Sequence, residues 1–466
     1  MASARLSKTI SSSTGKIFTL SVWLKKADNA AINTIFHLTS DSNTNKYIEI
    51  ASKSGYGIDF QLKNGTSGDN GTYLRRRTTR VLRDLSAWYH IVIRFDSTNS
   101  TASDRARIYI NGEQATDIDQ DSTPDVPLNF VSDLNNANSN LSLAGFVGGS
   151  NYLNGQLAHF HFTDGYSYAP TEFGETDATT GIWKPKTAPS VTYGTNGFFL
   201  KFDNSANMGL DSSGQGNNFS TNGTIIQTKD TPSNVFCTMN PLDFGVGSNN
   251  ATLSLVNTKA ISGGSNWRHS HGVLGFTAGK YYFEGKQGLT SDGDTGYVFG
   301  FCDQQYDTTD DPNSGTPNAK FYGRQGTTFY TPSGKTDNYF PNSSAGDILM
   351  VALDLDNNKI WFGLNGTWHN TNGSAGNTSY SSTTLNSSYP DATSVTIDTS
   401  KAGVYMPIIG SYNDGYIEAN FGNGYFGTTA VSSAQNPDDG VGIFEYDVPA
   451  GFRALCTKSL NAEEYS

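Results

Sequence analysis

The sequence predicts an all-β protein built from two tandem antiparallel β-sandwich domains. Its 466 residues exceed the roughly 250–300 at which a single hydrophobic core stops growing. Aromatic residues make up 12% of the chain and charged residues only 16%, below the usual level of about 25%, so Ser, Thr, Asn and Gly must cover much of the surface. Two hairpins of similar design, one in each half of the chain, indicate one sandwich per half.

The first hairpin, residues 88–113, consists of WYHIVIRFD, a loop and RARIYINGE. Its first limb alternates with a period of two, which is typical of a half-buried strand. One face carries Tyr89, Ile91, Ile93 and Phe95, and the other carries Trp88, His90, Val92 and Arg94. The second limb ends at Asn111-Gly112, a turn signal. We interpret this stretch as the central antiparallel pair of a sandwich.

The second hairpin, residues 346–368, repeats this layout as GDILMVALDLD, a short polar break and KIWFGLNGTW. Leu349, Val351, Leu353 and Leu355 share one face of the first limb. Residues 356–359 supply the turn, and Asn365-Gly366 closes the second limb. The two hairpins are therefore expected at equivalent places in two separate sandwiches.

Charge and hydropathy exclude two classes of partner. The net charge is −12, whereas binding to phosphate backbones needs a basic field, so nucleic acid is not expected as a partner. No run approaches 18 apolar residues, so membrane insertion is not expected either. The first 16 residues lack the apolar core of an export signal, which predicts synthesis and folding in a cytoplasm.

The N-terminal half contains further short alternating strands separated by polar turns, as in a sandwich or barrel. They cover residues 18–24, 34–38, 47–50, 57–62 and 153–162. In the last of these, His159 and His161 share a face opposite Phe160 and Phe162. Two histidines at this spacing could ligate a metal, but no third ligand is evident, so we expect the solvent face of a strand.

These strands resemble a known fold. FTLSVWLKK, WYHIVIRFD, RARIYINGE and LNGQLAHFHFTDG resemble successive strands of a laminin-G-like, concanavalin A-like jelly roll. Residues 181–219, and most specifically 196–219, resemble a module of structural proteins of marine tailed phages, in which a SPRY-like domain follows. GKYYFEGK, GYVFGFCD and YIEANFG resemble SPRY strands, and PAGFRALC resembles the closing segment of the phage version.

We therefore expect a laminin-G-like sandwich over residues 1–225, a linker over 226–250, a SPRY-like sandwich over 251–458 and a C-terminal tail over 459–466. Cys237 and Cys456 flank the second sandwich, whose ends should lie near each other. A disulfide between them is possible, whereas a reducing cytoplasm favours thiols.

Oxygen donors crowd the Gly-rich stretch 203–218, where we name Asp203, Asp211, Asn217 and Asn218, with Ser213 beside them. Ca²⁺ takes six to eight oxygen ligands, and laminin-G-like domains often bind it near a similar segment, so the resemblance implies a possible Ca²⁺ site. The alternative is that Asp and Asn cap tight turns by bonding their own backbone.

Two surfaces are candidates for recognition. Arg75, Arg76, Arg77 and Arg80, with Arg83, could meet an acidic partner, or could protect an edge strand from self-pairing. Loop aromatics of the second module could form a ligand-binding surface, because Tyr and Trp offer large contact areas at low entropic cost. These are Tyr306, Tyr322, Tyr330, Tyr339 and Trp368; the alternative is packing under long loops.

The resemblance implies a non-enzymatic surface protein of a tailed-phage virion, assembled in the host cytoplasm as multiple copies or a homo-oligomer. It would be a head decoration, a knob or a short tail appendage contacting capsid or tail proteins. The first alternative is an adhesion protein that binds host-surface glycans. The second is a glycoside hydrolase, for which the sequence places no carboxylate pair, nucleophile elbow or zinc signature.

Overall fold

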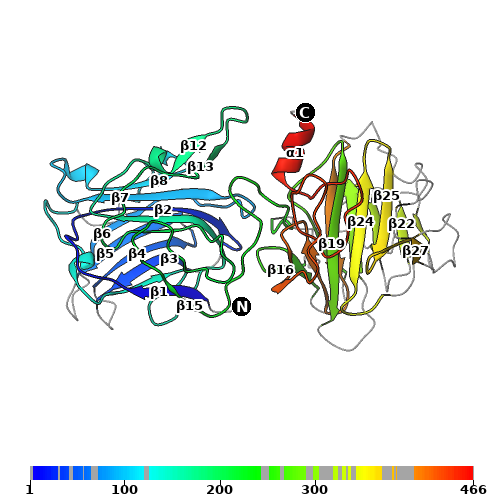
Figure 1. Ribbon diagram of the computed structural model, residues 1–466, viewed down its shortest axis with the longest axis horizontal. Coiled ribbons are helices and arrows are strands. Elements are labelled where there is room, and N and C mark those ends of the chain that lie inside the picture. The colour runs from blue at the N-terminus through cyan, green and yellow to red at the C-terminus, as the bar shows by residue number, and fades with distance from the viewer. Residues whose placement is uncertain are drawn as a thin grey trace. The chain divides into compact units, whose positions relative to one another are not determined.

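The computed structural model describes the chain with gaps and divides it into two compact units, residues 1–227 and 228–466 (Figure 1). The described residues are 4–29, 32–40, 46–55, 57–64, 72–119, 125–242, 251–262, 267–289, 297–303, 319–323, 328–331, 334–336, 343–369, 380–382, 385 and 403–464. For the strands between 319 and 336, only the backbone is described.

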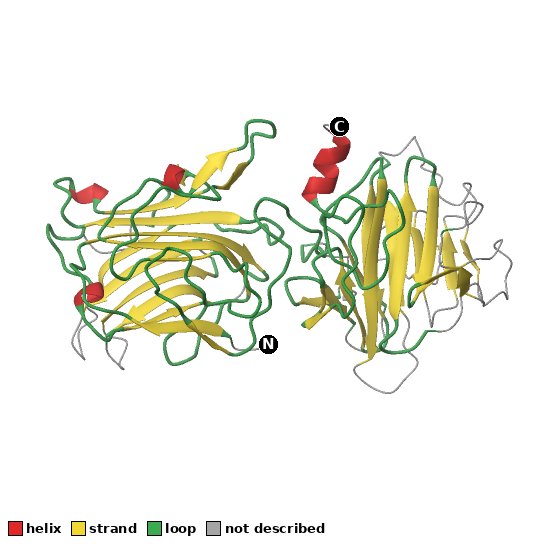
Figure 2. Ribbon diagram, viewed as in Figure 1, coloured by secondary structure: helices red, strands yellow, loops and turns green. Residues whose placement is uncertain are grey.

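The first unit is a sandwich of two antiparallel sheets (Figure 2). Sheet A contains, in spatial order, β15 (Ser220–Asn222), β1 (Arg5–Thr9), β10 (Asn140–Leu143), β3 (Ile32–Thr39), β4 (Lys46–Lys53), β5 (Ile58–Asn64) and β6 (Thr72–Arg77). Sheet B contains β14 (Phe198–Leu200), β11 (Gly155–Asp164), β2 (Ile17–Lys26), β7 (Tyr89–Asp96), β8 (Ala106–Ile110) and β9 (Glu113–Gln114). The pair β12 (Gly174–Thr176) and β13 (Trp183–Pro185) and the 3-10 turns η1 (Ala102–Asp104), η2 (Asp133–Asn135) and η3 (Pro170–Glu172) complete it.

The hairpin predicted at 88–113 is confirmed as β7 and β8, which pair in antiparallel register from Ile91–Ile110 to Phe95–Ala106. Ile91, Ile93 and Phe95 lie in the core between the sheets, as their alternation predicted. The Phe95 ring stacks on Phe18 at 4.9 Å. Hydrophobic burial on this one face therefore fixes the register of the hairpin.

The outer face of sheet B is covered, which corrects the expectation of a solvent-facing strand at His159 and His161. His161 is only 1% exposed, and its ring stacks on Phe199 at 3.9 Å. The Trp183 Nε1–H donates to His90 Nδ1 at 3.0 Å. Phe173, Tyr193 and Phe199, which follow β11 in the chain, pack around His161 and bury this part of the face.

The second unit also has two antiparallel sheets. Sheet C contains β16 (Thr252–Ser254), β17 (Lys259–Ile261), β29 (Gly415–Asn420), β19 (Lys280–Leu289), β24 (Ile348–Asp354), β25 (Lys359–Leu364), β26 (Thr367–His369) and β27 (Tyr380–Ser382). Sheet D contains β18 (Arg268–His271), β28 (Tyr405–Ser411), β20 (Tyr297–Asp303), β21 (Ala319–Gly323), β22 (Thr328–Thr331) and β23 (Gly334–Thr336). A short pair, β30 (Tyr425–Phe426) and β31 (Thr429–Ala430), and helix α1 (Thr457–Glu464) follow.

The second predicted hairpin is confirmed as β24 and β25, with Leu349, Val351 and Leu353 in the core between the sheets. The intervening Met350 and Ala352 are buried as well. Val441, Phe444, Val448 and Phe452 cover them from the C-terminal segment. The unit therefore has a third layer, which alternation along a strand does not reveal.

The segments at both boundaries of the second unit differ from the expectation. Residues 228–242, expected as part of a linker, belong to the second unit, and Phe236, Cys237 and Met239 are buried in its cores. Residues 457–464, expected largely as a tail, form α1, whose Leu460 packs on the core. Burial of these apolar side chains is favourable, whereas in a solvated linker or tail they would remain exposed to water.

Cys237 and Cys456 are thiols in the structure. Phe236 and Cys456 lie opposite each other in an antiparallel bridge, so the two cysteines are close along the backbone. Their side chains nevertheless belong to different clusters, Cys237 between the sheets and Cys456 on the outer face of sheet C. Opposite facing explains why proximity does not lead to a disulfide.

Among the residues that the structure describes, no helix combines the length and apolar character needed to span a bilayer.

Two matched core truncations test the independence of the units. Ile93 and Leu353 are both fully buried, one in each core. We expect Ile93→Ala or Leu353→Ala to destabilise its own unit by about 2–5 kcal/mol and to leave the other unit unchanged. Differential scanning calorimetry of the full chain, with each variant as the control for the other, measures this. A shift of both transitions in either variant would show one cooperative unit.

Candidate functional site

The arginine cluster predicted for partner binding is engaged in ion pairs within the first unit. Arg75, Arg76 and Arg77 lie on β6, the outermost strand of sheet A. The guanidiniums of Arg75 and Arg77 contact Asp59, Arg76 contacts Asp125, and Arg80 contacts Asp117. These pairs offset the positive charge, and the location fits the alternative of a charged edge strand.

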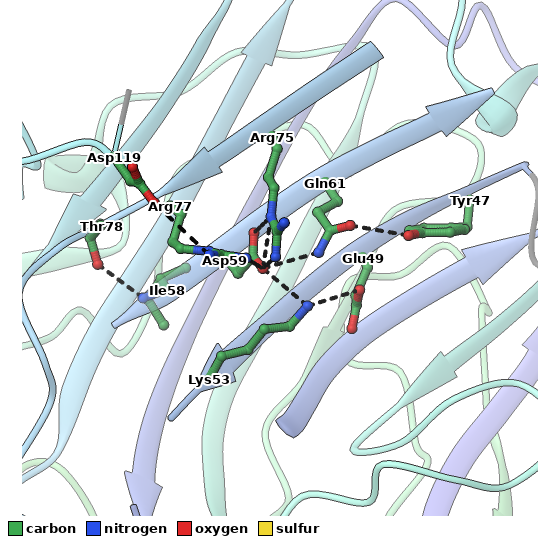
Figure 3. Close-up of polar contacts among 10 residues, drawn as sticks. All are labelled: Tyr47, Glu49, Lys53, Ile58, Asp59, Gln61, Arg75, Arg77, Thr78 and Asp119. Atoms are coloured by element: carbon green, nitrogen blue, oxygen red, sulfur yellow. Dashed lines mark hydrogen bonds and ion pairs between the residues drawn. The ribbon is translucent and has the colours of Figure 1, made fainter. Parts of the chain in front are cut away.

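Asp59 is the centre of a polar network on the outer face of sheet A (Figure 3). Its side chain is fully buried, and its Oδ2 lies 3.0 Å from Lys53 Nζ, 2.9 Å from Arg75 and 3.3 Å from Arg77. Gln61 Nε2 also donates to Asp59 at 3.0 Å. The network joins β4, β5 and β6, so the strands hold each of its side chains in register.

Tyr47, near the start of β4, is linked to this network through Gln61 (Figure 3). Its hydroxyl donates to Gln61 Oε1 at 3.1 Å. Burial, followed by the negative charges of Glu49 and Asp59, raises the pKa of Tyr47 to about 12. The phenol therefore stays protonated at neutral pH, and the bond to Gln61 fixes the orientation of the half-buried ring.

A small pocket of about 100 Å³ lies beside Tyr47. It is lined by Lys46 and Tyr47 of β4, Leu62 and Lys63 of β5, and residues of the 130–136 segment, among them Phe130 and Asp133. Asp133 accepts bonds from the Ser40 N–H at 2.6 Å and the Ser40 hydroxyl at 2.7 Å, which fix the segment against the end of β3. The pocket thus combines an aromatic ring, an apolar wall and two amines.

A polar row crosses sheet A next to this network. Ser142, His37, Glu49 and Gln61 lie opposite one another on β10, β3, β4 and β5. Burial raises the pKa of Glu49 and lowers that of His37 to about 4. His37 Nδ1 accepts the backbone N–H of Val147 at 3.3 Å, so the ring proton is on Nε2. Ser142 Oγ, His37 Nε2 and Glu49 Oε1 are buried without a hydrogen-bond partner, so the three side chains are not linked to one another through these atoms. The row is therefore not arranged as a Ser-His-acid triad.

Glu49 and Asp59 are a carboxylate pair that the sequence could not place. Lys53 Nζ lies 3.6 Å from Glu49 and 3.0 Å from Asp59. A glycosidase needs one carboxylate to reach the sugar on each side of the scissile bond. Asp59 is fully buried and held by three cations, so its carboxylate has no path to a substrate.

The residues suggested for Ca²⁺ hold a turn together, which agrees with the alternative interpretation of this stretch. The Asp211 carboxylate accepts bonds from the backbone N–H groups of Phe199, Ser213 and Asn217. Asn218 Oδ1 accepts the Asp211 N–H at 2.8 Å, and Asn217 contacts Lys8. The exposed Asp203 lies instead near His159. Within the described ranges, no group of three or more acidic, His or Cys side chains could hold a metal ion.

Five aromatic residues of the second unit were suggested as a recognition surface, and the structure describes the side chain of one of them, Trp368. Trp368 is only 2% exposed and packs with Tyr282 in the apolar cluster on the outer face of sheet C. Its assignment to a recognition surface is therefore wrong. Tyr306 and Tyr339 lie outside the described residues. Tyr322 and Tyr330 lie on β21 and β22, where the description covers only the backbone.

Family comparisons agree with the domain order predicted from the strands. Residues 2–172 match the laminin-G-type model of the concanavalin A-like lectin/glucanases superfamily, and residues 280–384 match the SPRY domain model. The chain therefore contains a concanavalin A-like domain followed by a SPRY domain, and the two tandem β-sandwiches are confirmed. A search of curated proteins gave no match.

Solved structures with partial similarity include three of the same TM-score, 0.26, and 16% identity. The SPRY domain of human HERC1 matches over 35% of this chain and 87% of its own. A heptameric SAP-like pentraxin from Limulus polyphemus matches over 36% and 72%. The Ruminococcus gnavus IT-sialidase CBM40 bound to alpha2,3 sialyllactose matches over 34% and 80%. Similarity at this level carries no inference about a ligand.

Proposed function

We propose that the protein is a non-enzymatic adhesion protein that binds glycans at the Tyr47 pocket. The observation that carries the proposal is the pocket itself, which an oriented ring lines together with two amines and an apolar wall; one of the amines, Lys63 Nζ, lies 5.7 Å from the centre of the Tyr47 ring. Aromatic rings contact the CH faces of sugars, while amines and amides bond their hydroxyls or acidic groups. The description of the matching superfamily, which includes lectins, supports this reading.

Loss of the Tyr47 ring is expected to weaken glycan binding at least tenfold, equivalent to about 1.4 kcal/mol. Full-length protein is first screened on a glycan array, and the strongest oligosaccharide is then titrated by calorimetry against Tyr47→Ala. Tyr47→Phe keeps the ring and should retain most of the affinity. Lys184→Ala, on the separate pair β12–β13, is the control. Equal affinity in Tyr47→Ala and the unaltered protein, or no glycan bound, contradicts the proposal.

We further propose that this adhesion protein is displayed on the surface of a tailed-phage virion, as a head decoration, knob or short tail appendage. The resemblance of residues 196–219 to a marine-phage module supports it, as does the domain order. A net charge of −12 would keep many copies soluble and would limit nonspecific binding to nucleic acid. Capsid or tail proteins would be its structural partners, and host-surface glycans its ligands.

Mass spectrometry of purified particles tests this location directly. We expect the chain in intact virions and its loss after surface proteolysis that leaves the capsid closed. Its absence from virions, or its protection inside them, contradicts the location. Neither result bears on glycan binding by the purified protein, so the two proposals fail separately.

A further inference from the structure

A stacked pair of tyrosines lies in the loop between β11 and η3, on the first unit. The rings of Tyr166 and Tyr168 have centroids 6.0 Å apart and planes inclined by only 17°. Tyr166 is 41% exposed, and it is one of the few large hydrophobic side chains that are exposed among the described residues. We propose that this pair is a second glycan-binding platform, on which the CH-rich face of a pyranose ring stacks against Tyr166.

The loop is fixed to sheet B at several points, so the platform is rigid. Thr19 Oγ1 donates to the Tyr166 carbonyl at 3.0 Å and accepts the Tyr168 N–H at 2.9 Å. Thr163 Oγ1 donates to the same carbonyl at 3.1 Å. A ligand that stacks on an already ordered side chain avoids much of the entropic cost of immobilising it.

The Tyr168 ring is anchored at both ends and supports Tyr166 from behind. Its hydroxyl accepts the Thr192 N–H at 2.9 Å, and its ring packs edge-on against the buried Phe173 at 6.3 Å. The stack therefore runs from the interior outwards and ends on Tyr166. An exposed aromatic at the end of such a stack presents one ring face for binding.

The surroundings suit a sugar better than a protein side chain. Gly165 is exposed next to the pair, and apart from its two chain neighbours no residue has an atom within 4 Å of where a Cβ would stand. Arg94 donates to Ser167 Oγ at 2.6 Å and adds a polar rim. A flat ring with polar neighbours offers CH–π contact and hydroxyl partners together, whereas a stable protein interface needs a much larger contact area.

This platform is distinct from the Tyr47 pocket. Thr19 lies between the core residues Phe18 and Leu20 on β2, so its side chain is on the outer face of sheet B. Tyr47 precedes the core residue Ile48 and lies on the outer face of sheet A. The two sites therefore occupy opposite faces of one sandwich, and one copy of the unit could bridge two glycan chains.

The test uses full-length protein with cellohexaose, maltohexaose and chitohexaose as neutral probes and oligogalacturonate as an anionic probe. We expect at least one probe to protect Tyr166 from nitration by tetranitromethane, read by peptide mass spectrometry. Tyr166→Ala should weaken binding of that probe at least tenfold, and Tyr166→Phe should bind like the unaltered protein. A Thr192→Ser variant keeps the backbone bond to Tyr168 and serves as the control.

Separate use of Tyr47→Ala distinguishes the two sites. If Tyr47→Ala leaves nitration protection at Tyr166 intact, the platform stands whether or not the Tyr47 pocket binds a glycan. Binding that Tyr166→Ala does not weaken overturns the platform, as does the absence of protection by all four probes.

Discussion

Acidification from pH 7 to pH 4 is expected to unfold the first unit while the second remains folded. His90 is fully buried under Trp183 and Trp23, and burial lowers its pKa to about 3. Burial also lowers the pKa of His37 to about 4 and that of His161 well below its usual value. Each of these histidines is neutral in the folded unit and gains a proton on unfolding, so stability is lost as the pH falls.

The size of the effect follows from proton linkage. A histidine with an unfolded pKa near 6.5 contributes about 1.4 kcal/mol per pH unit between that value and its folded pKa. From pH 6.5 to 4, His90 and His37 together could remove up to about 6–7 kcal/mol, comparable with the whole stability of many domains. His159, with Lys201 and Asp203 beside it, is more open and contributes less.

Calorimetry as a function of pH tests this expectation, with the transition of the second unit as an internal control. Most of the loss should occur between pH 6.5 and 4.5, where carboxylates of ordinary pKa are still largely ionised. Within the second unit, Glu284 should contribute in the opposite direction, because burial raises its pKa to about 7. A first transition that does not move between pH 7 and 4.5 contradicts the assignment.

Removal of the Glu284 carboxylate is expected to detach the C-terminal layer of the second unit. Glu284 lies on β19, and its carboxylate accepts the backbone N–H groups of Glu445 and Tyr446, both at 2.9 Å. It also accepts the Tyr282 hydroxyl at 2.8 Å. In Glu284→Ala these three donors lose their acceptor, at about 1–3 kcal/mol for each group, or about 3–6 kcal/mol together.

Glu284→Gln is the matched control, because it keeps the volume of the side chain. Its amide oxygen can accept one backbone N–H, whereas its nitrogen is a donor and faces the other, so an intermediate loss is expected. The transition of the second unit and limited proteolysis of residues 431–450 measure the effect. Equal stability and equal protease resistance in all three proteins would show that the segment is held by apolar packing alone.

The strands were predictable from the sequence, whereas what covers them was not. Alternation located both hairpins correctly, because one face of each must be apolar. It could not show that His161 and Trp368 are buried, because the cover comes from Phe199 and from the C-terminal segment, distant in the sequence. The alternation of residues along a strand is the same whether or not a later segment covers the face opposite the core.

The candidate site illustrates the same limit. The arginines of β6 stood out as a charged run. The partner of Arg75 is Asp59 on β5, which also forms an ion pair with Lys53 of β4. Identifying the partner needs the register of three strands, which the sequence alone does not provide. The pocket at Tyr47 needs in addition the 130–136 segment to fold back to the end of β4.

The pairing of β1 with β15 has a mechanical consequence. Arg5 lies opposite Asn222 and Ser7 opposite Ser220, so the chain enters and leaves the first unit at the same end of one antiparallel pair. A pulling force along the chain would load the hydrogen bonds of this pair one after another rather than all together. The unit should therefore lengthen at low force by peeling β15 from the edge of sheet A. The strands β4 and β5, which carry the Tyr47 pocket, lie toward the other edge of sheet A and would bear little of the load, so a tethered protein could yield to fluid shear and still keep hold of its ligand.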